Sequence, residues 1–328
     1  MPANKRIAAI LYADFGRDAR ADDQDVLRQA GEFARVLGAA GYSTPEVRLA
    51  LDLGGAAARL REEAPHFVVN LVETVAGSDS LQYLGPALLD HLGLPYTGCK
   101  AEAVFLCANK VLAKRMLRSG AIGTPPWIPL LAARSGESPS DPPWIVKPVA
   151  EHASRGIEED SVVKDPAVLR ERASAPDAGR YYVEGFVEGR EFNVSLLGGP
   201  RGVEVLPPAE IDFRGFAAGK PRIVGYRAKW DERSFEYRHT PRRFDFDRRD
   251  RGLLDELAVI ARRSWDLLGL SGYARVDFRI DRAGRPWVLE VNTNPCLSPD
   301  AGFAAAAARG GLSLDDVILR IIENVREK

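Results

Sequence analysis

The chain has 328 residues, of which 45% are hydrophobic and 28% are charged, and its formal net charge at pH 7 is -1. This composition indicates a globular protein with room for two or three compact units, and it argues against a membrane-spanning or fibrous protein and a nucleic-acid binder. The cysteines lack metal-type spacing and the first apolar run is too short for a signal peptide, so we expect free thiols and a cytoplasmic protein.

The first part of the chain alternates between apolar strands and amphipathic helices. A strand over Ile7–Tyr12 precedes a helix over Asp23–Ala40, which Gly41 ends. A second strand over Phe67–Val72 precedes a helix over Leu81–Leu92. This alternation predicts a parallel α/β unit. Because no Gly-x-Gly-x-x-Gly sequence opens the first helix, we expect no dinucleotide site there.

Two lysines stand on the elements that follow. Lys110 lies on a helix predicted over Ala101–Ser119, where a lysine is usually a solvated charge. Lys147 lies near the end of a strand predicted over Trp144–Pro148, beside the polar stretch Glu151–Gly156. That lysine could place a positive charge on a phosphate, and the backbone amides of the stretch could cover the phosphates. The pattern is weak alone, because the stretch contains one glycine.

The middle of the chain carries two acidic candidates and a long irregular segment. Two strands around a glycine-containing turn are predicted over Tyr181–Leu197, and they include Glu184 and Glu191, each of which could also be a surface turn residue. The segment between Ala209 and Phe246 is rich in charges and aromatic residues but has little periodicity, which predicts a functional loop or lid. The pair Arg242–Arg243 within it is mixed with acids, which favours a solvated face and leaves local anion contacts open.

Amphipathic helices are predicted over Arg251–Leu268 and Leu312–Val325, and between them lies a β-hairpin. Two alternating segments, 273–280 and 285–292, flank a turn at Asp281–Gly284.

Pairing that closes on this turn sets Asp277 opposite Glu290 and Arg275 opposite Asn292. The other face is predicted to be the core face, and it comprises Val276, Phe278, Ile280, Leu289 and Val291.

The polar face of this hairpin has the chemistry of a metal site. Two carboxylates on facing strands lie about 5 Å apart and repel each other unless a cation neutralises them. Asp277, Glu290 and the amide oxygen of Asn292 are the oxygen ligands that suit Mg²⁺. The alternative is a solvated face on which Arg275 and Arg279 pair with the acids. The polar end of the second strand, with further Asn and Thr side chains, favours the metal site.

The strings Ala-Arg-Val-Asp-Phe at 274–278 and Leu-Glu-Val-Asn-Thr-Asn-Pro at 289–295 resemble the metal-binding end of the ATP-grasp ligases, in particular the D-alanine–D-alanine ligases. The resemblance extends over about residues 65–325. It implies an ATP-grasp fold of mixed α/β and α+β class. The implied parts are an N-terminal parallel α/β (pre-ATP-grasp) domain at 1–99, a small central α+β lobe at 100–180 and a large C-terminal α+β lobe at 181–328, the two lobes sandwiching ATP.

The resemblance also implies a role for ten residues. The Mg²⁺ ligands, which could also bind Mn²⁺, would be Asp277, Glu290 and Asn292. The nucleotide would be bound by Lys110 and Lys147 at the phosphates, by Glu184 and the backbone of Val187 at the adenine amino group, and by Glu191 at the ribose. The catalytic residues would be Lys229, which reaches the transferred phosphate, and Arg275, which stabilises the tetrahedral intermediate.

The implied reaction joins a small-molecule carboxylate to an amine, with amino acids as expected substrates and ADP as a product. A carboxylate attacks the γ-phosphate to form an acyl phosphate, and the amine then attacks that intermediate. We expect no nucleic-acid or membrane partner, and the family is compatible with a homodimer. Two alternatives stay open: a nucleotide-binding regulatory or interaction protein that does not ligate, and a kinase-type transfer to a small acceptor.

The groups that would bind the amino acids differ from the family pattern. Tyr12–Arg17 does not match the family's Gly-Gly-x-Ser-x-Glu-type segment, and Asn70–Glu73 replaces its His-Gly segment. Ala153 and Ala301 stand where the family has hydroxyl residues, and Trp230 stands where it has a tyrosine. We therefore predict a ligase of the same mechanism whose substrates are not two D-alanines.

Overall fold

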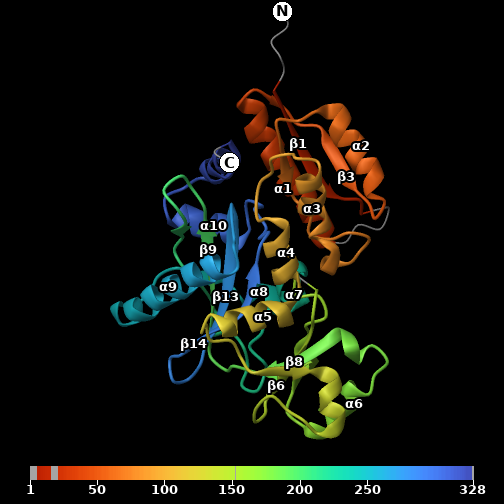
Figure 1. Ribbon diagram of the computed structural model, residues 1–328. Coiled ribbons are helices and arrows are strands. Elements are labelled where there is room, and N and C mark those ends of the chain that lie inside the picture. The colour runs from red at the N-terminus through yellow and green to blue at the C-terminus, as the bar shows by residue number, and fades with distance from the viewer. Residues whose placement is uncertain (1–5, 16–20, 152, 327–328) are drawn as a thin grey trace, which may run out of the picture.

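A computed structural model describes residues 6–15, 21–151 and 153–326, and three sheets organise these residues (Figure 1). The N-terminal sheet, the central sheet and the C-terminal sheet follow one another along the chain. No helix within the described ranges is both long and apolar enough to cross a lipid bilayer.

The N-terminal part is the predicted parallel α/β unit. Its elements are β1 (Arg6–Ala13), α1 (Ala21–Ala39), β2 (Tyr42–Ser43), β3 (Glu46–Leu49), α2 (Leu53–Glu63), β4 (Phe67–Asn70) and α3 (Leu84–His91). Strand β1 pairs in parallel with each of the other three strands. Every residue of β4 is buried, as expected for a parallel strand covered on both faces. The predicted α/β class of this part is therefore confirmed.

The central sheet is antiparallel, with strand order β5-β8-β6-β7. Its strands are β5 (Trp127–Pro129), β6 (Trp144–Pro148), β7 (Val162–Val163) and β8 (Tyr181–Gly185), and α6 (Pro166–Ala173) packs beside them (Figure 1). The two strands predicted over Tyr181–Leu197 exist but do not pair with each other: β8 belongs to this sheet, whereas the next strand belongs to the C-terminal sheet. The linker between them, 186–189, therefore joins two sheets.

The C-terminal sheet is antiparallel and has the order β12-β11-β9-β13-β14, with β10 beside β9. Its strands are β9 (Arg190–Leu197), β10 (Glu204–Val205), β11 (Ala209–Ile211), β12 (Arg242–Arg243), β13 (Tyr273–Ile280) and β14 (Pro286–Asn292). The helices of this part are α7 (Tyr226–Trp230), α8 (Phe235–Arg238), α9 (Arg251–Leu267), α10 (Gly302–Arg309) and α11 (Leu314–Arg326). The segment predicted as a lid thus holds two short helices and two short strands.

The hairpin of β13 and β14 has the predicted register at its polar face. Asp277 pairs with Glu290 and Arg275 pairs with Asn292. The predicted core face is wrong at Leu289, because a β-bulge follows Asp277 and sets Phe278 opposite Val288. Val288 is therefore buried, and Leu289 turns to the pocket side together with Glu290.

The single helix predicted over Ala101–Ser119 is two helices, α4 (Ala101–Ala108) and α5 (Lys110–Ser119). Asn109 separates them with an extended backbone, and its side-chain oxygen accepts hydrogen bonds from the first amides of α5. Asparagine is a strong N-cap, so the break has a local cause. Residues of both helices, such as Val104 and Leu117, share a core with the C-terminal sheet rather than with the central one.

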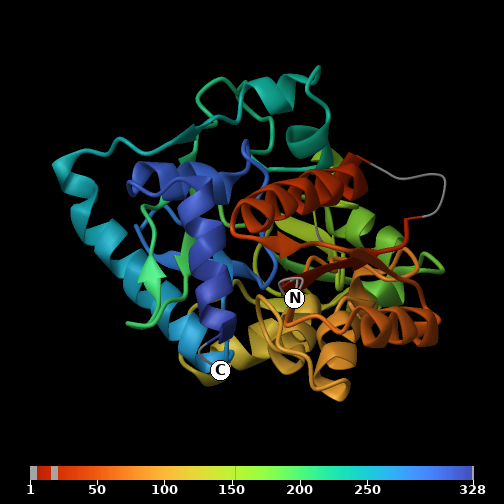
Figure 2. The ribbon, with the colours of Figure 1, turned by 90° about the horizontal axis from the view of Figure 1, so that it is seen from above.

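One core joins the two ends of the chain. Ile10 of β1 and Phe33 of α1 are fully buried in the same cluster as Phe303 of α10 and Ile321 of α11. Seen from above, α1 runs beside α11 (Figure 2). The N-terminal part is therefore fixed to the C-terminal part by apolar packing.

Candidate functional site

A pocket of about 590 Å³ lies where the parts of the chain meet. All ten residues singled out from the sequence line it: Lys110, Lys147, Glu184, Val187, Glu191, Lys229, Arg275, Asp277, Glu290 and Asn292. Side chains of α1, β6, β8, β9, α7, β13 and β14 contribute to its wall. Residues that lie far apart in the sequence thus face one cavity.

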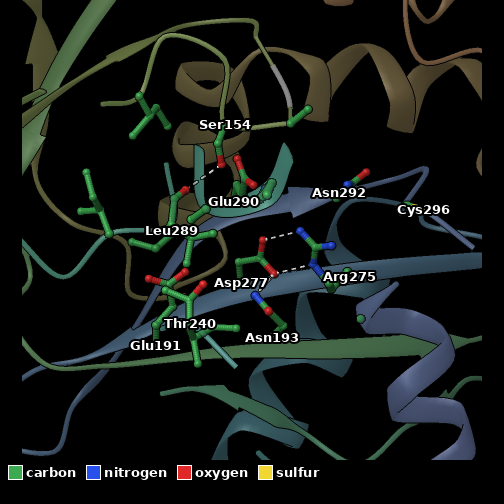
Figure 3. A pocket seen from close by; sticks show the side chains of 18 of the residues that line it. Ser154, Glu191, Asn193, Thr240, Arg275, Asp277, Leu289, Glu290, Asn292 and Cys296 are labelled. Atoms are coloured by element: carbon green, nitrogen blue, oxygen red, sulfur yellow. Dashed lines mark hydrogen bonds and ion pairs between the residues drawn. The ribbon is translucent and has the colours of Figure 1, made fainter. Parts of the chain in front are cut away.

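The polar face of the hairpin forms one wall (Figure 3). Arg275 donates from Nε and Nη2 to both carboxylate oxygens of Asp277, at 2.7 and 2.8 Å. Asn193 of β9 donates to the same carboxylate at 2.7 Å. Burial opposes the charge of Arg275, but its contacts with Asp277 and the charge of Glu290 together outweigh burial and raise the pKa of this guanidinium. The carboxylate and the guanidinium are therefore held rigidly at the pocket wall.

The donor set at this wall fits a hard cation in part. Asp277 and Glu290 face each other across the ladder, and Asn292 follows on the same face. Within the described ranges no group of three or more His, Cys, Asp or Glu side chains is arranged to hold a metal ion. Two carboxylates and an amide oxygen are a suitable set for Mg²⁺, which fills its remaining positions with water and phosphate oxygens. The alternative of acids paired with arginines is realised at Asp277 and also at Glu191, which Arg279 contacts at 2.7 Å.

A buried triad of charges lies at the central sheet. Glu184 is 1% exposed, and its two carboxylate oxygens contact Lys147 at 2.5 Å and Lys114 at 2.7 Å. Burial opposes the charge of Glu184, but the two lysines outweigh it and lower the pKa of this carboxyl. Lys114 also donates to Thr124 Oγ1 at 2.7 Å and does not line the pocket. The contact of Lys114 with Glu184 could not be predicted from the sequence, because Glu184 lies on a strand 70 residues further along the chain.

The linker and β9 supply the end of the pocket expected to hold the nucleoside. Val187 lies in the linker, and its carbonyl accepts from Arg279 at 3.5 Å. Burial raises the pKa of Glu191 above its ordinary value even though Arg279 opposes the shift. Leu289, exposed to the pocket by the bulge, adds an apolar surface at the same wall (Figure 3).

Two further lysines approach the hairpin from other elements. Lys110 at the start of α5 is buried, lies 3.7 Å from Glu290 and donates to the backbone carbonyl of Glu151. Lys229 of α7 lines the pocket, and burial together with the nearby Arg275 lowers the pKa of its ammonium. The positive charges are therefore distributed around the two hairpin carboxylates.

Side-chain hydrogen bonds join the loop after β6 to the predicted lid, residues 209–246. Ser154 donates from Oγ to the carbonyl of Val224 at 2.7 Å (Figure 3), and Trp230 donates from Nε1 to the carbonyl of Ala153 at 3.2 Å. Ala153 and Ser154 both have left-handed backbones, with φ of 56° and 62°. Non-glycine residues rarely adopt this conformation, so the loop takes a shape more typical of a glycine-rich loop. His152 lies outside the described residues.

Asp25, Arg242 and Cys296 line the other end of the pocket, where the groups that bind the amino acids were predicted to differ from the family pattern. Asp25 of α1 accepts hydrogen bonds from Ser298 Oγ at 2.6 Å and from Cys296 Sγ at 2.7 Å. Arg242 of β12 also lines the pocket here. The sequence pattern favoured a solvated face for Arg242 and left a local anion contact open, and the side chain is exposed while it borders the pocket. The segment Tyr12–Arg17 extends beyond the described residues at its end.

Comparisons with known proteins identify the family. The family described as "D-ala D-ala ligase C-terminus" matches residues 132–323. A D-alanine–D-alanine ligase of Chromohalobacter salexigens is 32% identical over 279 residues, which are 82% of this chain and 81% of that protein. The uncharacterized protein y4sG of Sinorhizobium fredii is also 32% identical, over 78% of this chain and 73% of that protein.

The fold agrees with solved structures of the same family. The crystal structure of D-alanine–D-alanine ligase from Bacillus anthracis complexed with ATP matches with a TM-score of 0.70 and 21% identity, over 98% of each chain. The ligase of Coxiella burnetii matches with a TM-score of 0.69 and 18% identity. The family membership favours the ligase over the non-ligating alternative. The chain belongs to the D-alanine–D-alanine ligase family and is an ATP-grasp ligase.

Proposed function

We propose that the protein is an ATP- and Mg²⁺-dependent ligase that joins a carboxylate to an amine and releases ADP and phosphate. The observation that carries the proposal is the convergence of the ten predicted residues on one pocket, with Asp277 directly opposite Glu290. The paired carboxylates supply a cation site, and the surrounding lysines supply positive charge for the phosphates. Such an arrangement suits phosphoryl transfer, in which positioning and electrostatics do most of the catalysis.

The residues divide between nucleotide and reaction centre. Glu184, the Val187 carbonyl and Glu191 would bind the nucleoside, and Lys110 and Lys147 would bind its phosphates. Asp277, Glu290 and Asn292 would hold Mg²⁺ or Mn²⁺, which when bound neutralises charge on the phosphate oxygens.

Lys229 would contact the transferred phosphate. Arg275 is held by Asp277 at 2.7 Å, so its guanidinium is already oriented to stabilise an oxyanion in the ligation step.

The division of labour along the chain follows from this assignment. The ATP would lie between the central lobe, expected at 100–180, and the C-terminal lobe, expected at 181–328, while the N-terminal domain at 1–99 would close the substrate end. Because β8 pairs with β5 and β6, we place the boundary between the two lobes after Gly185. We further propose a cytoplasmic enzyme, consistent with its free cysteines, and a homodimer remains the assembly to test.

We propose that the amino-acid substrates differ from two D-alanines. Ala153 and Trp230, which replace a hydroxyl and a tyrosine of the family, bond to each other through the Ala153 carbonyl and the indole N–H. An unpaired buried polar group costs about 1–3 kcal/mol, so replacing the partners of an ammonium or carboxylate changes substrate preference. D-alanine alone is expected to give weak dipeptide formation, and another carboxylate or amine is expected to react faster.

The test is ADP and phosphate release with MgATP over a panel of D- and L-amino acids and other carboxylates and amines, with products identified by mass spectrometry. Turnover that requires both a carboxylate and an amine supports the ligase. A stable phosphorylated product without an amine would indicate a kinase instead. If D-alanyl-D-alanine is made efficiently and D-alanine is the best substrate of the panel, the proposed change of substrate is wrong.

A further inference from the structure

Arg242 borders the pocket beside Ala301, the residue at which a hydroxyl was expected from the family resemblance. It lies on the two-residue strand β12 and donates from Nη1 to the backbone carbonyl of Asp300 at 3.1 Å. Its Nε lies 3.0 Å from the position that a Cβ on Gly302 would take. The guanidinium therefore rests against the start of α10, whose N-cap residue Ala301 offers no side-chain hydrogen bond.

We propose that Arg242 is a specificity-determining residue that binds the carboxylate of the second, amine-bearing substrate, in place of the hydroxyl absent at Ala301. This inference rests on the ligase function proposed above, which it deepens by assigning an anion-binding group to the acceptor. The preferred acceptor is therefore an amine that carries a carboxylate, such as an amino acid, rather than a neutral amine.

Among the described residues, no carboxylate forms an ion pair with Arg242, whose hydrogen bond goes to a backbone carbonyl. The carboxylate of Asp300 is bound by Arg28 at 3.1 Å, while Arg242 donates to the backbone carbonyl of Asp300. The Arg242 side chain is exposed at the edge of the pocket, where the nearby guanidinium of Arg275 repels its positive charge. An incoming anion would relieve this repulsion.

The chemistry of the side chain selects the kind of anion. A guanidinium has five N–H donors in a planar fork, and one of them is engaged by the Asp300 carbonyl. The fork matches the two oxygens of a carboxylate, and such bidentate pairs are stronger than neutral hydrogen bonds. Lys229 lines the same pocket and adds a second positive charge.

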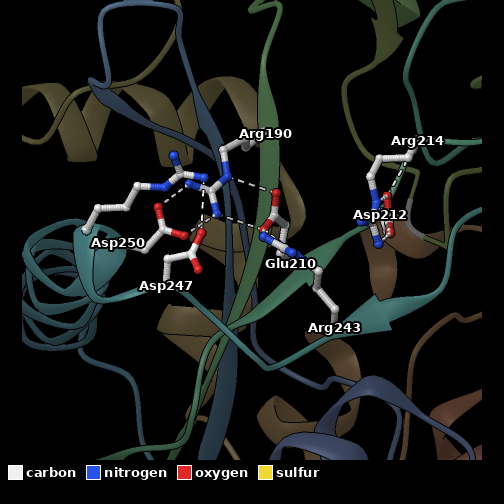
Figure 4. A network of polar contacts seen from close by, with 8 residues as sticks. Arg190, Glu210, Asp212, Arg214, Arg243, Asp247 and Asp250 are labelled. Carbon is white, nitrogen blue, oxygen red and sulfur yellow. Dashed lines mark hydrogen bonds and ion pairs between the residues drawn. The ribbon is translucent and has the colours of Figure 1, made fainter.

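The adjacent residue provides a matched control. Arg243 follows Arg242 on β12 but points into a network outside the pocket, where it contacts Glu210 at 2.9 Å beside Arg190 and Asp250 (Figure 4). Arg243 does not line the pocket. Replacement of either arginine removes one positive charge from the same strand, but only Arg242→Ala removes it from the pocket.

The experiment compares amino-acid acceptors with their carboxamides in the full-length enzyme with MgATP. Wild type is expected to prefer the carboxylate form. Arg242→Ala should lower kcat/KM for the carboxylate acceptor by about 10- to 100-fold, the factor expected for losing hydrogen bonds to a charged group, and should leave the carboxamide unchanged. The loss should appear in the acceptor KM, with the KM for ATP and the Tm near wild type.

Two further variants sharpen the test. Arg243→Ala should keep the wild-type preference for carboxylate over carboxamide, whatever it does to the Tm. Ala301→Ser in the Arg242→Ala background should regain part of that preference, because it restores a hydroxyl at the same place. If Arg242→Ala keeps the wild-type ratio between the two acceptor forms, Arg242 does not bind the carboxylate.

A binding measurement separates this inference from the ligase function. If no pair of substrates turns over in wild type, the proposed function fails, and the same amino acids and carboxamides are titrated calorimetrically into the MgADP-bound proteins. Carboxylate binding that is weakened by Arg242→Ala and not by Arg243→Ala then still supports the anion site. Carboxylate binding equal in wild type and Arg242→Ala, or absent from both, overturns it.

Discussion

Glu290 tests the proposed metal site at the scale of a single residue. It faces Asp277 across the hairpin, so Glu290→Gln keeps the shape of the wall and removes one of the two negative charges that face each other there. We expect ADP formation to fall at least about 100-fold, the scale of losing a key electrostatic group. A coupled assay of ADP release measures the effect.

The matched control is Glu188→Gln, which removes a surface carboxylate that contacts Arg282 outside the pocket. It should leave ADP formation near wild type. Full activity in Glu290→Gln would show that this carboxylate does not serve phosphoryl transfer.

The two lysines of the buried triad are expected to separate binding from stability. Lys147 lines the pocket and Lys114 does not, although both contact Glu184. Lys147→Met should weaken ATP binding while Lys114 still compensates Glu184. Lys114→Met should lower the free energy of unfolding by several kcal/mol, because it removes one partner of a fully buried charge and the partner of Thr124.

Calorimetric ATP titration and urea unfolding of both variants measure the two effects. A large loss of stability in Lys147→Met with no change in ATP affinity would assign that lysine a structural role instead.

The residues that the sequence did not reveal share one property. Lys114 and Arg242 each act through partners that the chain brings together only in three dimensions: Lys114 meets Glu184 of β8, and Arg242 meets the start of α10. A single lysine on a helix or an Arg-Arg pair among acids resembles any solvated surface. By contrast, Asp277 and Glu290 could be assigned to facing strands of one hairpin from the sequence, because a glycine-containing turn joins those strands. Their exact pairing also depends on the bulge, since a turn of residues 281–284 alone would set Asp277 opposite Val288.

At the scale of the element, long periodic patterns predicted well and local exceptions did not. Strand β6 has the predicted bounds, and α9 differs from its prediction by one residue. The bulge after Asp277 and the break at Asn109 each depend on one residue leaving a regular pattern that otherwise continues. The bulge matters most for the pocket, because it adds Leu289 to the wall.

Hydrogen bonds to the loop after β6 are among the contacts that hold the predicted lid in place. Trp230→Phe keeps an aromatic ring and removes the N–H that bonds to the Ala153 carbonyl at 3.2 Å. A net loss of about 1 kcal/mol should raise the open population about fivefold. Because slow proteolysis follows the open population, trypsin cleavage after the exposed Arg214 should accelerate by a similar factor.

Trp287→Phe is the control for this prediction, since it removes an indole N–H that bonds to Asp281 at 2.9 Å in the hairpin turn, away from the lid. Its cleavage rate should match wild type. Equal cleavage rates for Trp230→Phe and wild type would mean that the hydrogen bond from Trp230 to Ala153 does not hold the lid closed.

At the scale of the whole molecule, the core shared by the two chain ends bears on the domain division. Ile10 and Phe33 of the N-terminal part are buried in one cluster with Phe303 and Ile321 of the C-terminal part. The boundary near residue 99 therefore crosses a shared core, although the N-terminal part also has a core of its own, which packs α2 and α3 against β3 and β4. The N-terminal part should lose stability when the last helix is weakened.

Ile321→Ala tests this coupling, because Ile321 is fully buried in α11. We expect the free energy of unfolding to fall by about 2–5 kcal/mol, the usual range for truncating a buried isoleucine. Amide exchange should accelerate in β1 as well as in β13, since both belong to the same cooperative unit. Leu319→Ala on the same helix truncates a side chain that is 41% exposed and should change little. If exchange in β1 is unaffected by Ile321→Ala while β13 loses protection, the N-terminal domain is stabilised independently and the shared core does not couple the two parts.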